Sequence, residues 1–403
     1  MQKHVLYILI FVICGACHVK DDVQLPEVVS ETIVLPTIKM DDKYQFFVDR
    51  FLDTINMAMA DQACPGLAIT IVHDSTILAL QGIGLANEQT RKPVSTETIF
   101  RLGSVSKGFA AVLTQILVKE GYLSWDDPII KYIPEFAFRD TEQSDQITVH
   151  HLLSQSTGLP PHTFTNYLES GKDVSEILHL LEGVNTVANP GEICTYQNVT
   201  YALIEEILEQ ATGKPFEQLL QEKIFTPLDM KNASTSCDAI AAAEMRSSPH
   251  QFNRYEDKYM PIPYNEKYYN AISAGGINAS INDMQKYLQL LMGNHPEILD
   301  VATIAEFFKP NVPSDYERKY FHRWDGLWHN SYGLGWRVFD FSGDIWAYHG
   351  GFVNGYRAEI AINQTSKVGI CMLFNASCGL PDYAMKVFFE RFSQDRVCRQ
   401  EQL

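Results

Sequence analysis

A serine and a lysine three positions apart, Ser104 and Lys107, stand at the start of a predicted apolar helix. Residues at i and i+3 share one face of a helix, and the amides at a helix N-terminus favour developing negative charge. A serine hydroxyl is a weak nucleophile until a base takes its proton, and a lysine does so only when burial or another cation lowers its pKa. The pair therefore fits a nucleophile with its base, or a helix cap followed by a solvated lysine.

The residues around this pair favour the nucleophile. Phe100-Arg101-Leu102-Gly103 precedes Ser104, and Gly108 with Ala110-Ala111 keeps the following helix face narrow. With these neighbours the segment resembles the serine β-lactamase and DD-peptidase family, the penicillin-recognising enzymes, and especially its class C-like branch. The resemblance implies that Ser104 is acylated and that Lys107 belongs to its base.

The family's second element is Tyr-x-Asn on a loop between helices, which Tyr196-Gln197-Asn198 matches after Pro190-Gly191 and before an apolar helix. In the family this tyrosine shares the base role with the lysine, and a phenol beside a cation can relay a proton to the leaving group. The amide of Asn198 is expected to orient the substrate and Lys107. A second match, Tyr268-Tyr269-Asn270, lacks the Pro-Gly and the following helix, so we interpret it as an exposed aromatic loop.

The family's third element is Lys-Thr-Gly or a variant on a strand, and His349-Gly350-Gly351 resembles such a variant. Glycines let a substrate backbone lie against the strand, and the amide of Phe352 would pair with that of Ser104 as an oxyanion hole. His349 is expected to position the substrate together with both glycines. A neutral imidazole binds a carboxylate less well than an ammonium does, so this histidine favours a peptidase or an esterase over an efficient β-lactamase.

The resemblance extends from about Tyr44 to Phe392, and other segments match without carrying chemistry. They are Cys64-Pro65-Gly66-Leu67, Ser156-Thr157-Gly158-Leu159-Pro160, Ala274-Gly275-Gly276 and Tyr332-Gly333-Leu334-Gly335-Trp336. The family implies an α+β fold of the β-lactamase/transpeptidase type and an acyl-enzyme reaction on ester, D-amino-acid peptide or β-lactam carbonyls. It implies small-molecule or peptide substrates, including peptidoglycan-related ones, with no metal or organic cofactor.

Apolar periodicity predicts the same architecture. Helical spacing indicates an amphipathic helix over residues 42–61, and β-branched segments indicate a hairpin over 67–82 and four strands over 335–374, followed by a helix at Pro381–Phe392. The region between these ends has mostly helical periodicity. We expect an antiparallel sheet built from both chain ends and flanked by helices. Residues 42–97 plus 332–396 would form an α/β lobe and 98–331 a mostly helical lobe, together one domain.

Three other classes of protein could in principle use these residues. A Ser-His-Asp hydrolase with a nucleophile elbow needs Gly-x-Ser-x-Gly, which does not occur in the chain. A metallo-hydrolase needs clustered ligands, whereas His150, His151 and His162 have no carboxylate or cysteine partners at metal-ligand spacing. A penicillin-binding or sensor protein that acylates slowly, or does not hydrolyse, stays open, although the intact serine, lysine and tyrosine favour an enzyme.

The composition excludes further classes of function. The chain has 403 residues, of which 46% are hydrophobic and 20% charged, with a net charge of -17. This charge opposes binding to nucleic acids and to anionic membrane surfaces. An anionic substrate would need a local cation, for which Lys107 and His349 are the candidates. The cysteines after residue 17 fit no zinc spacing and are expected to be buried free thiols.

The N-terminus predicts export. Lys3, the apolar run Val5 to Ile13 and the small pair Gly15-Ala16 are typical of a signal peptide, and the run is shorter than the roughly 20 residues that span a bilayer. Gly15-Ala16-Cys17 resembles the end of a bacterial lipoprotein signal, which predicts a signal at residues 1–17, lipidation of Cys17 and a spacer at 18–41. Cys14 stands where leucine is usual, so ordinary cleavage is the alternative. We expect a periplasmic, membrane-anchored lipoprotein.

Overall fold

The computed structural model describes residues 43–61, 64–314, 324 and 326–400, with side chains described as far as residue 395. These residues all belong to the unit Ile38–Leu403. The predicted signal at residues 1–17, the lipidation candidate Cys17 and the predicted spacer at 18–41 lie outside them.

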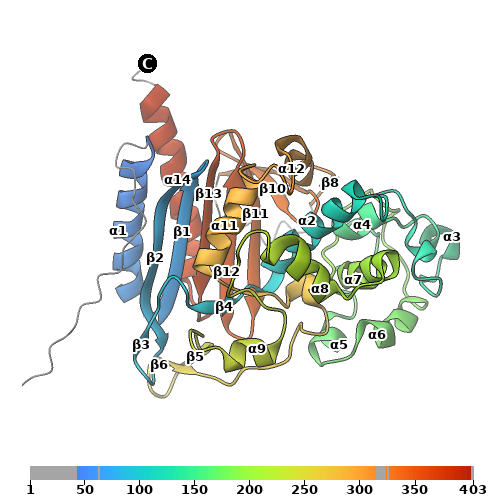
Figure 1. Ribbon diagram of the computed structural model, residues 1–403, viewed down its shortest axis with the longest axis horizontal. Helices are drawn as coiled ribbons and strands as arrows, with labels where there is room; N and C mark the ends of the chain where they lie inside the picture. The colour runs from blue at the N-terminus through green and yellow to red at the C-terminus, as the bar shows by residue number, and fades with distance from the viewer. Residues whose placement is uncertain (1–42, 62–63, 315–323, 325, 401–403) are drawn as a thin grey trace, which may run out of the picture. The chain divides into compact units, whose positions relative to one another are not determined.

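A nine-stranded antiparallel sheet organises the described residues and joins strands from both ends of the chain (Figure 1). Its strands lie in the order β3-β2-β1-β13-β12-β11-β10-β9-β8. Their bounds in that order are Lys92–Pro93, Thr76–Asn87, Gly66–His73, Val368–Phe374, Tyr356–Asn363, Asp344–Val353, Arg337–Phe341, Leu327–Tyr332 and Val312–Pro313. The centre pairs β1 with β13, where Leu67 lies opposite Phe374. The predicted sheet assembled from two distant chain ends is therefore confirmed.

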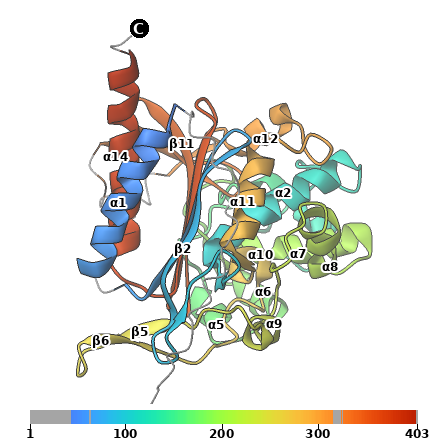
Figure 2. The same ribbon diagram turned by 60° about the vertical axis from the view of Figure 1, so that its left-hand side comes forward.

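Helices cover both faces of the sheet (Figures 1 and 2). On one face, α1 (Gln45–Asp61) and α14 (Leu380–Gln400) pack side by side over the strands. On the other face lie α11 (Ile281–Leu291) and α2 (Ser106–Lys119), whose buried side chains form a second apolar cluster. The sheet thus separates a layer of terminal helices from the layer that contains Ser104.

The alternation of side chains along β1 decides what each face buries. Leu67, Ile69 and Ile71 join the cluster with α1 and α14, whereas Ala68 and Val72 join the cluster with α2 and α11. Successive side chains of a strand point to opposite faces, so a strand that is apolar throughout must be covered on both sides. Each fully buried large apolar side chain contributes roughly 1.5–3 kcal/mol to the free energy of folding.

The remaining elements fall between β3 and β8 in the chain and are mostly helical, as the sequence predicts. They are β4 (Ile99–Arg101), η1 (Gly103–Val105), η2 (Ile129–Lys131), α3 (Thr141–Ser144), α4 (Val149–Leu153), α5 (Thr165–Glu169), α6 (Val174–Leu181), α7 (Val199–Thr212), α8 (Phe216–Leu220), η3 (Gln221–Phe225), α9 (Cys237–Ala242), β5 (His250–Asn253), β6 (Lys258–Pro261), α10 (Ile272–Gly275), β7 (Asn278–Ser280) and α12 (Val301–Phe307). Two small antiparallel sheets, β4 with β7 and β5 with β6, complete the fold.

Several element ends differ from the sequence prediction, among them the end of β2, which continues beyond the predicted Gly82 to Asn87. The strand expected to end at His349 continues as β11 to Val353, because Gly350 and Gly351 pair with Glu359 and Ala358 of β12. Glycine weakens an isolated strand, but a neighbour on the sheet supports its backbone. The last helix, predicted to end near Phe392, continues to Gln400.

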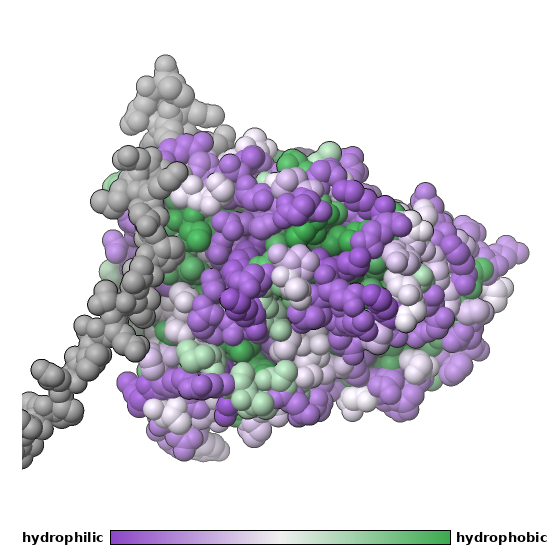
Figure 3. Space-filling view, viewed as in Figure 1, coloured by the Kyte–Doolittle hydropathy of each residue, from purple (hydrophilic) through white to green (hydrophobic). Residues whose placement is uncertain are grey.

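Within residues 43–400, as far as they are described, no helix has both the length and the apolar character needed to cross a membrane. Hydrophilic residues predominate on the face shown in Figure 3. The predicted free thiols are confirmed for Cys64, Cys194, Cys237, Cys371 and Cys378, of which the last is partly exposed.

Candidate active site

Ser104 lies in the tight turn η1, directly before α2 and against β11. Gly103 begins this turn with φ of 53°, and a Cβ atom there would lie 2.7 Å from the amide nitrogen of Phe352. A side chain at Gly351 would collide with the carbonyl oxygen of Leu102. Both glycines are therefore needed for the close approach of the turn and the strand. This approach puts the backbone amides of Ser104 and Phe352 beside each other.

Lys107 is fully buried and is not a solvated lysine. Its Nζ donates to Asn198 Oδ1 at 2.8 Å and to the backbone carbonyl of Ala274 at 2.8 Å, and it lies 3.4 Å from Ser104 Oγ. The same nitrogen stands 4.7 Å from the centre of the Tyr196 ring. The amine is thus held against the serine hydroxyl by neutral oxygen acceptors from the loop before α7 and from α10.

Tyr196 and Asn198 come from the loop before α7 and reach the same place. Tyr196 is 6% exposed and lies between two cations, since Lys107 Nζ and the guanidinium carbon of Arg337 are each 4.7 Å from its ring centre. Its ring centre is 6.1 Å from that of His349. Lys107 and Asn198, which are 91 positions apart in the chain, therefore meet in this site.

His349 is buried beneath the site and is held neutral. Its Nδ1 lies 2.9 Å from the carbonyl oxygen of Gly350, which only accepts, so Nδ1 carries the proton. Its Nε2 faces the hydroxyl of Tyr332 at 3.2 Å and Arg337 Nη1 at 3.4 Å. Burial, and then the charges of Arg337 and Lys107, hold the pKa of His349 well below its usual value. The imidazole is not the cation of this site.

The sequence analysis missed Arg337, the cation beside this imidazole. Arg337 begins β10, is 4% exposed and lines the same cavity as Ser104. The available signal was its position directly after Tyr332-Gly333-Leu334-Gly335-Trp336, at the start of a predicted strand. A charged residue at such a position must be paired or face a site.

Tyr268 overturns the expectation that its segment is an exposed aromatic loop. Its side chain is 8% exposed, and its hydroxyl accepts from Asn198 Nδ2 at 3.0 Å and donates to Glu169 Oε1 at 2.8 Å. The segment differs from the true Tyr-x-Asn element in sequence context, but the fold of α5 against the loop before α10 carries it to the same cavity. Sequence spacing could not reveal this because the contact is tertiary.

A carboxyl group supports the backbone carbonyl that Lys107 contacts. Glu205 of α7 accepts from the backbone nitrogen and the hydroxyl of Ser273 at 2.7 and 2.6 Å. Ser273 precedes Ala274 in α10. Burial raises the pKa of Glu205 to about 7.

These groups line one cavity of about 420 Å³. It contains the side chains or backbone of Ser104, Pro161, His162, Thr165, Glu169, Tyr196, Asn198, Tyr268, Arg337, Gly350, Gly351, Phe352 and Arg357. Lys107 and His349 lie behind this lining, in contact with it. All the residues that the sequence analysis selected after residue 17 are thus brought together here. The described residues contain no cluster of three or more metal-ligating side chains.

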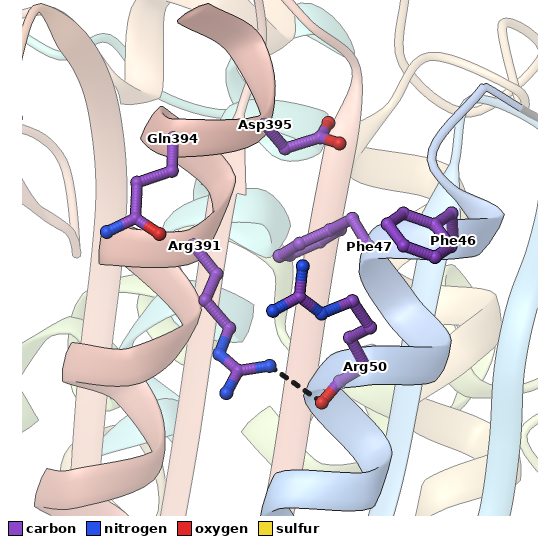
Figure 4. Close-up of a pocket in the computed structure, with 6 residues that line it drawn as sticks. All are labelled: Phe46, Phe47, Arg50, Arg391, Gln394 and Asp395. Carbon is purple, nitrogen blue, oxygen red and sulfur yellow. Dashed lines mark hydrogen bonds between the residues drawn. The ribbon is translucent and has the colours of Figure 1, made fainter. Parts of the chain in front are cut away.

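A second cavity, of about 290 Å³, lies between α1 and α14 on the other face of the sheet (Figure 4). Its lining residues are Phe46, Phe47, Arg50, Arg391, Gln394 and Asp395. Arg391 donates to the backbone carbonyl of Arg50 at 2.7 Å, which ties the two helices together. The lining holds no hydroxyl or thiol nucleophile, so this cavity is not the catalytic candidate.

The fold and the serine-lysine site define a penicillin-recognising type of protein. The model of the Beta-lactamase family matches residues 51–389, and the chain belongs to this family. The predicted family and the predicted fold are both confirmed.

Curated relatives match at low identity. The chain is 23% identical over 321 residues to Unguisins hydrolase ungD' of Aspergillus campestris, covering 77% of this chain and 58% of that protein. It is 24% identical over 326 residues to Protein flp of Staphylococcus aureus, covering 77% and 59%. The chain therefore spans less than two thirds of the length of these relatives.

Solved structures share the fold. The octameric penicillin-binding protein homologue from Pyrococcus abyssi superposes with a TM-score of 0.73 at 26% identity, covering 85% of this chain and 77% of that chain. The structure titled SurE superposes with a TM-score of 0.71 at 18% identity, covering 88% and 77%. The second likeness concerns the fold alone.

Proposed function

We propose that the protein is a serine hydrolase that works through an acyl-enzyme on Ser104. The observation that carries the proposal is the buried amine of Lys107, 3.4 Å from Ser104 Oγ, in a cavity large enough for a small substrate. A hydroxyl becomes an effective nucleophile when a positioned base takes its proton. The family membership of the chain supports the same reaction class.

In the proposed reaction, Ser104 Oγ attacks the substrate carbonyl carbon and its proton passes to the Lys107 and Tyr196 pair. The carbonyl oxygen becomes an oxyanion that accepts from the backbone amides of Ser104 and Phe352, a contact worth roughly 3 kcal/mol per donor. Collapse breaks the bond to the leaving alcohol or amine, which takes the proton from the same pair. Water then attacks the ester on Ser104 by the reverse steps, releasing the acid and restoring the hydroxyl.

The substrate class we propose is an ester or a D-amino-acid peptide, with β-lactams as poor substrates. The reason is electrostatic, since His349 is neutral and binds a carboxylate less well than an ammonium does. Arg337 lines the same cavity beside His349 and Tyr196, so the carboxylate of an ester or peptide substrate would meet a guanidinium there and not an ammonium at the position of His349. Guanidinium groups bind carboxylates through paired, charge-assisted hydrogen bonds. Asn198 and the glycines of β11 would position the rest of the substrate.

The test compares wild type with Ser104→Ala on nitrophenyl esters and on a fluorescent penicillin. Ester turnover that is lost in the variant supports the hydrolase. Stable labelling of Ser104 without turnover would instead support a sensor or slowly acylating penicillin-binding protein. If the folded protein showed no turnover and no labelling, both candidate functions would be contradicted.

For the N-terminus we propose export and lipid attachment at Cys17, which supports a periplasmic, membrane-anchored location. The support is the run of apolar residues followed by Gly15-Ala16-Cys17. Labelling cells with radioactive palmitate should mark the wild type and not Cys17→Ala. Equal labelling of both would contradict the anchor.

A further inference from the structure

A chain of hydrogen bonds leads from Lys107 to the rim of the cavity. Lys107 Nζ donates to Asn198 Oδ1 at 2.8 Å, and Asn198 Nδ2 donates to Tyr268 Oη at 3.0 Å. Tyr268 Oη donates to Glu169 Oε1 at 2.8 Å, and Lys267 Nζ lies 3.2 Å from Glu169 Oε2. The proposed chemistry uses the first two residues of this chain and leaves the rest without a role.

The direction of each bond follows from the carboxylate at the outer end. A carboxylate oxygen only accepts hydrogen bonds, so the Tyr268 hydroxyl donates its single proton to Glu169 Oε1. The phenol oxygen then offers lone pairs, which attract the amide nitrogen of Asn198. The amide oxygen is thereby turned toward Lys107, which can only donate. Reversing the amide would put nitrogen donors against the lysine.

Burial makes this orientation consequential at the inner end. Asn198 is 5% exposed and Lys107 is fully buried, so water cannot easily replace a lost partner. The outer end is open, because the side chain of Glu169 is 37% exposed. The carboxyl group of Glu169 therefore lies at the cavity rim, and its effect reaches the buried amide through Tyr268.

We propose that Glu169 and Tyr268 are positioning residues that fix the amide of Asn198 and thereby keep an oxygen acceptor on Lys107. The inference rests on the acyl-transfer function proposed above. Neither residue needs to touch the reacting carbonyl, since both act through Asn198. The Tyr268-Tyr269-Asn270 segment thus contributes one side chain to the same machinery as Tyr196.

The experiment measures kcat and KM for p-nitrophenyl acetate in Tyr268→Phe and Glu169→Ala. This substrate has a small, uncharged acyl group that cannot form an ion pair with Glu169, so a loss of rate cannot come from a lost charge contact to the substrate. We expect kcat to fall about tenfold in each variant with KM within about twofold, the scale of one lost hydrogen bond. Glu169→Gln keeps an accepting oxygen and should stay within about twofold of wild type.

The double variant Glu169→Ala/Tyr268→Phe tests the order of the chain. If Glu169 acts only through Tyr268, the double variant is no slower than Tyr268→Phe alone, because the second change removes nothing further. Losses that multiply would show that Glu169 acts by another route and would overturn the inference. A wild-type rate in Tyr268→Phe would overturn it as well.

The neighbouring tyrosine provides a matched control. Tyr269 Oη donates to Asn278 Oδ1 at 2.7 Å and does not contact Asn198, so Tyr269→Phe removes a similar hydroxyl without touching the chain. It should keep the wild-type kcat, and a tenfold loss would show that any missing hydroxyl here disturbs packing, against the inference. Turnover that persists at the wild-type rate in Ser104→Ala would contradict the proposed function itself. That outcome distinguishes a failure of the proposed function from a failure of the inference about Glu169 and Tyr268. Glu169→Ala changes an exposed side chain, so it tests the inference even if Tyr268→Phe does not fold.

Discussion

The two walls of the cavity handle positive charge in different ways. On the helical wall, Lys107 is buried among neutral acceptors, the oxygens of Asn198 and Ala274. On the strand wall, His349 is neutral and the charge belongs to Arg337. The walls meet at Tyr196, whose ring lies 4.7 Å from both cations. The function proposed above assigns proton transfer to the helical wall and recognition of a substrate charge to the strand wall.

Removing the amine from the helical wall should have the largest effect. We expect Lys107→Ala to lower kcat/KM for nitrophenyl esters at least about 100-fold, because general acid-base groups contribute that much. Tyr196→Phe should have a similar effect. Steady-state kinetics on purified, folded variants measure both. A near-normal rate in either variant would remove that residue from the proposed proton transfer.

Removing the charge from the strand wall should change selectivity rather than basal rate. We expect Arg337→Ala to lower kcat/KM for a substrate with a free carboxylate about 10- to 100-fold relative to the methyl ester of that substrate, the scale of a charge-assisted hydrogen bond. Arg357→Ala is the matched control, because it removes a second guanidinium from the lining of the same cavity. Equal selectivity in wild type and Arg337→Ala would contradict the assignment of the charge.

Substitution of Gly351 tests whether the fold depends on the close contact between β11 and the backbone of Leu102. Gly351→Ala should destabilise the fold by about 1–3 kcal/mol, because the new Cβ collides with the carbonyl of Leu102 and one of the two backbones must move. Thermal or urea unfolding measures the loss. Gly171→Ala is a useful comparison, since no heavy atom lies within 4 Å of a Cβ there although its φ of 91° is also unfavourable. A smaller loss at Gly351 than at Gly171 would count against the contact.

The neutral state of His349 predicts a small dependence of stability on pH. The pKa of His349 in the folded protein lies below the ordinary 6.5. Between these two pKa values the unfolded chain therefore binds more protons than the folded protein does. The stability that the neutral imidazole contributes is complete above pH 6.5 and is lost as the pH falls toward the folded-state pKa. Unfolding midpoints of wild type and His349→Gln, measured from pH 8 to pH 5, should converge as the pH falls. Parallel curves would show that the imidazole does not titrate as argued.

The sequence could predict residues whose partners are local or belong to a motif. Ser104 and Lys107 are neighbours on one turn, and the flanking glycines of β11 identify the strand that approaches them. The β-branched, apolar segments also predicted β1 and β13, although they could not show that Leu67 lies opposite Phe374.

The sequence could not predict residues that reach the cavity through tertiary packing. Glu169 and Tyr268 meet only because α5 and the loop before α10 fold together, with 99 positions between them in the chain. Arg337 has no local signal except its position directly after Trp336 at the start of a strand. The sequence analysis compared His349 with an ammonium as a neutral imidazole, but it could not show that burial beside Arg337 keeps the imidazole neutral.

The pairing of β1 with β13 has a consequence for synthesis of the chain. These strands form the centre of the sheet, yet Gly66 lies near the start of the described residues and Phe374 near their end. The chain must therefore be synthesised as far as Phe374 before the two central strands can join, and long-range pairing of this kind slows folding. Until then the apolar side chains of β1 lack their cover, and uncovered strands of this kind are prone to aggregation.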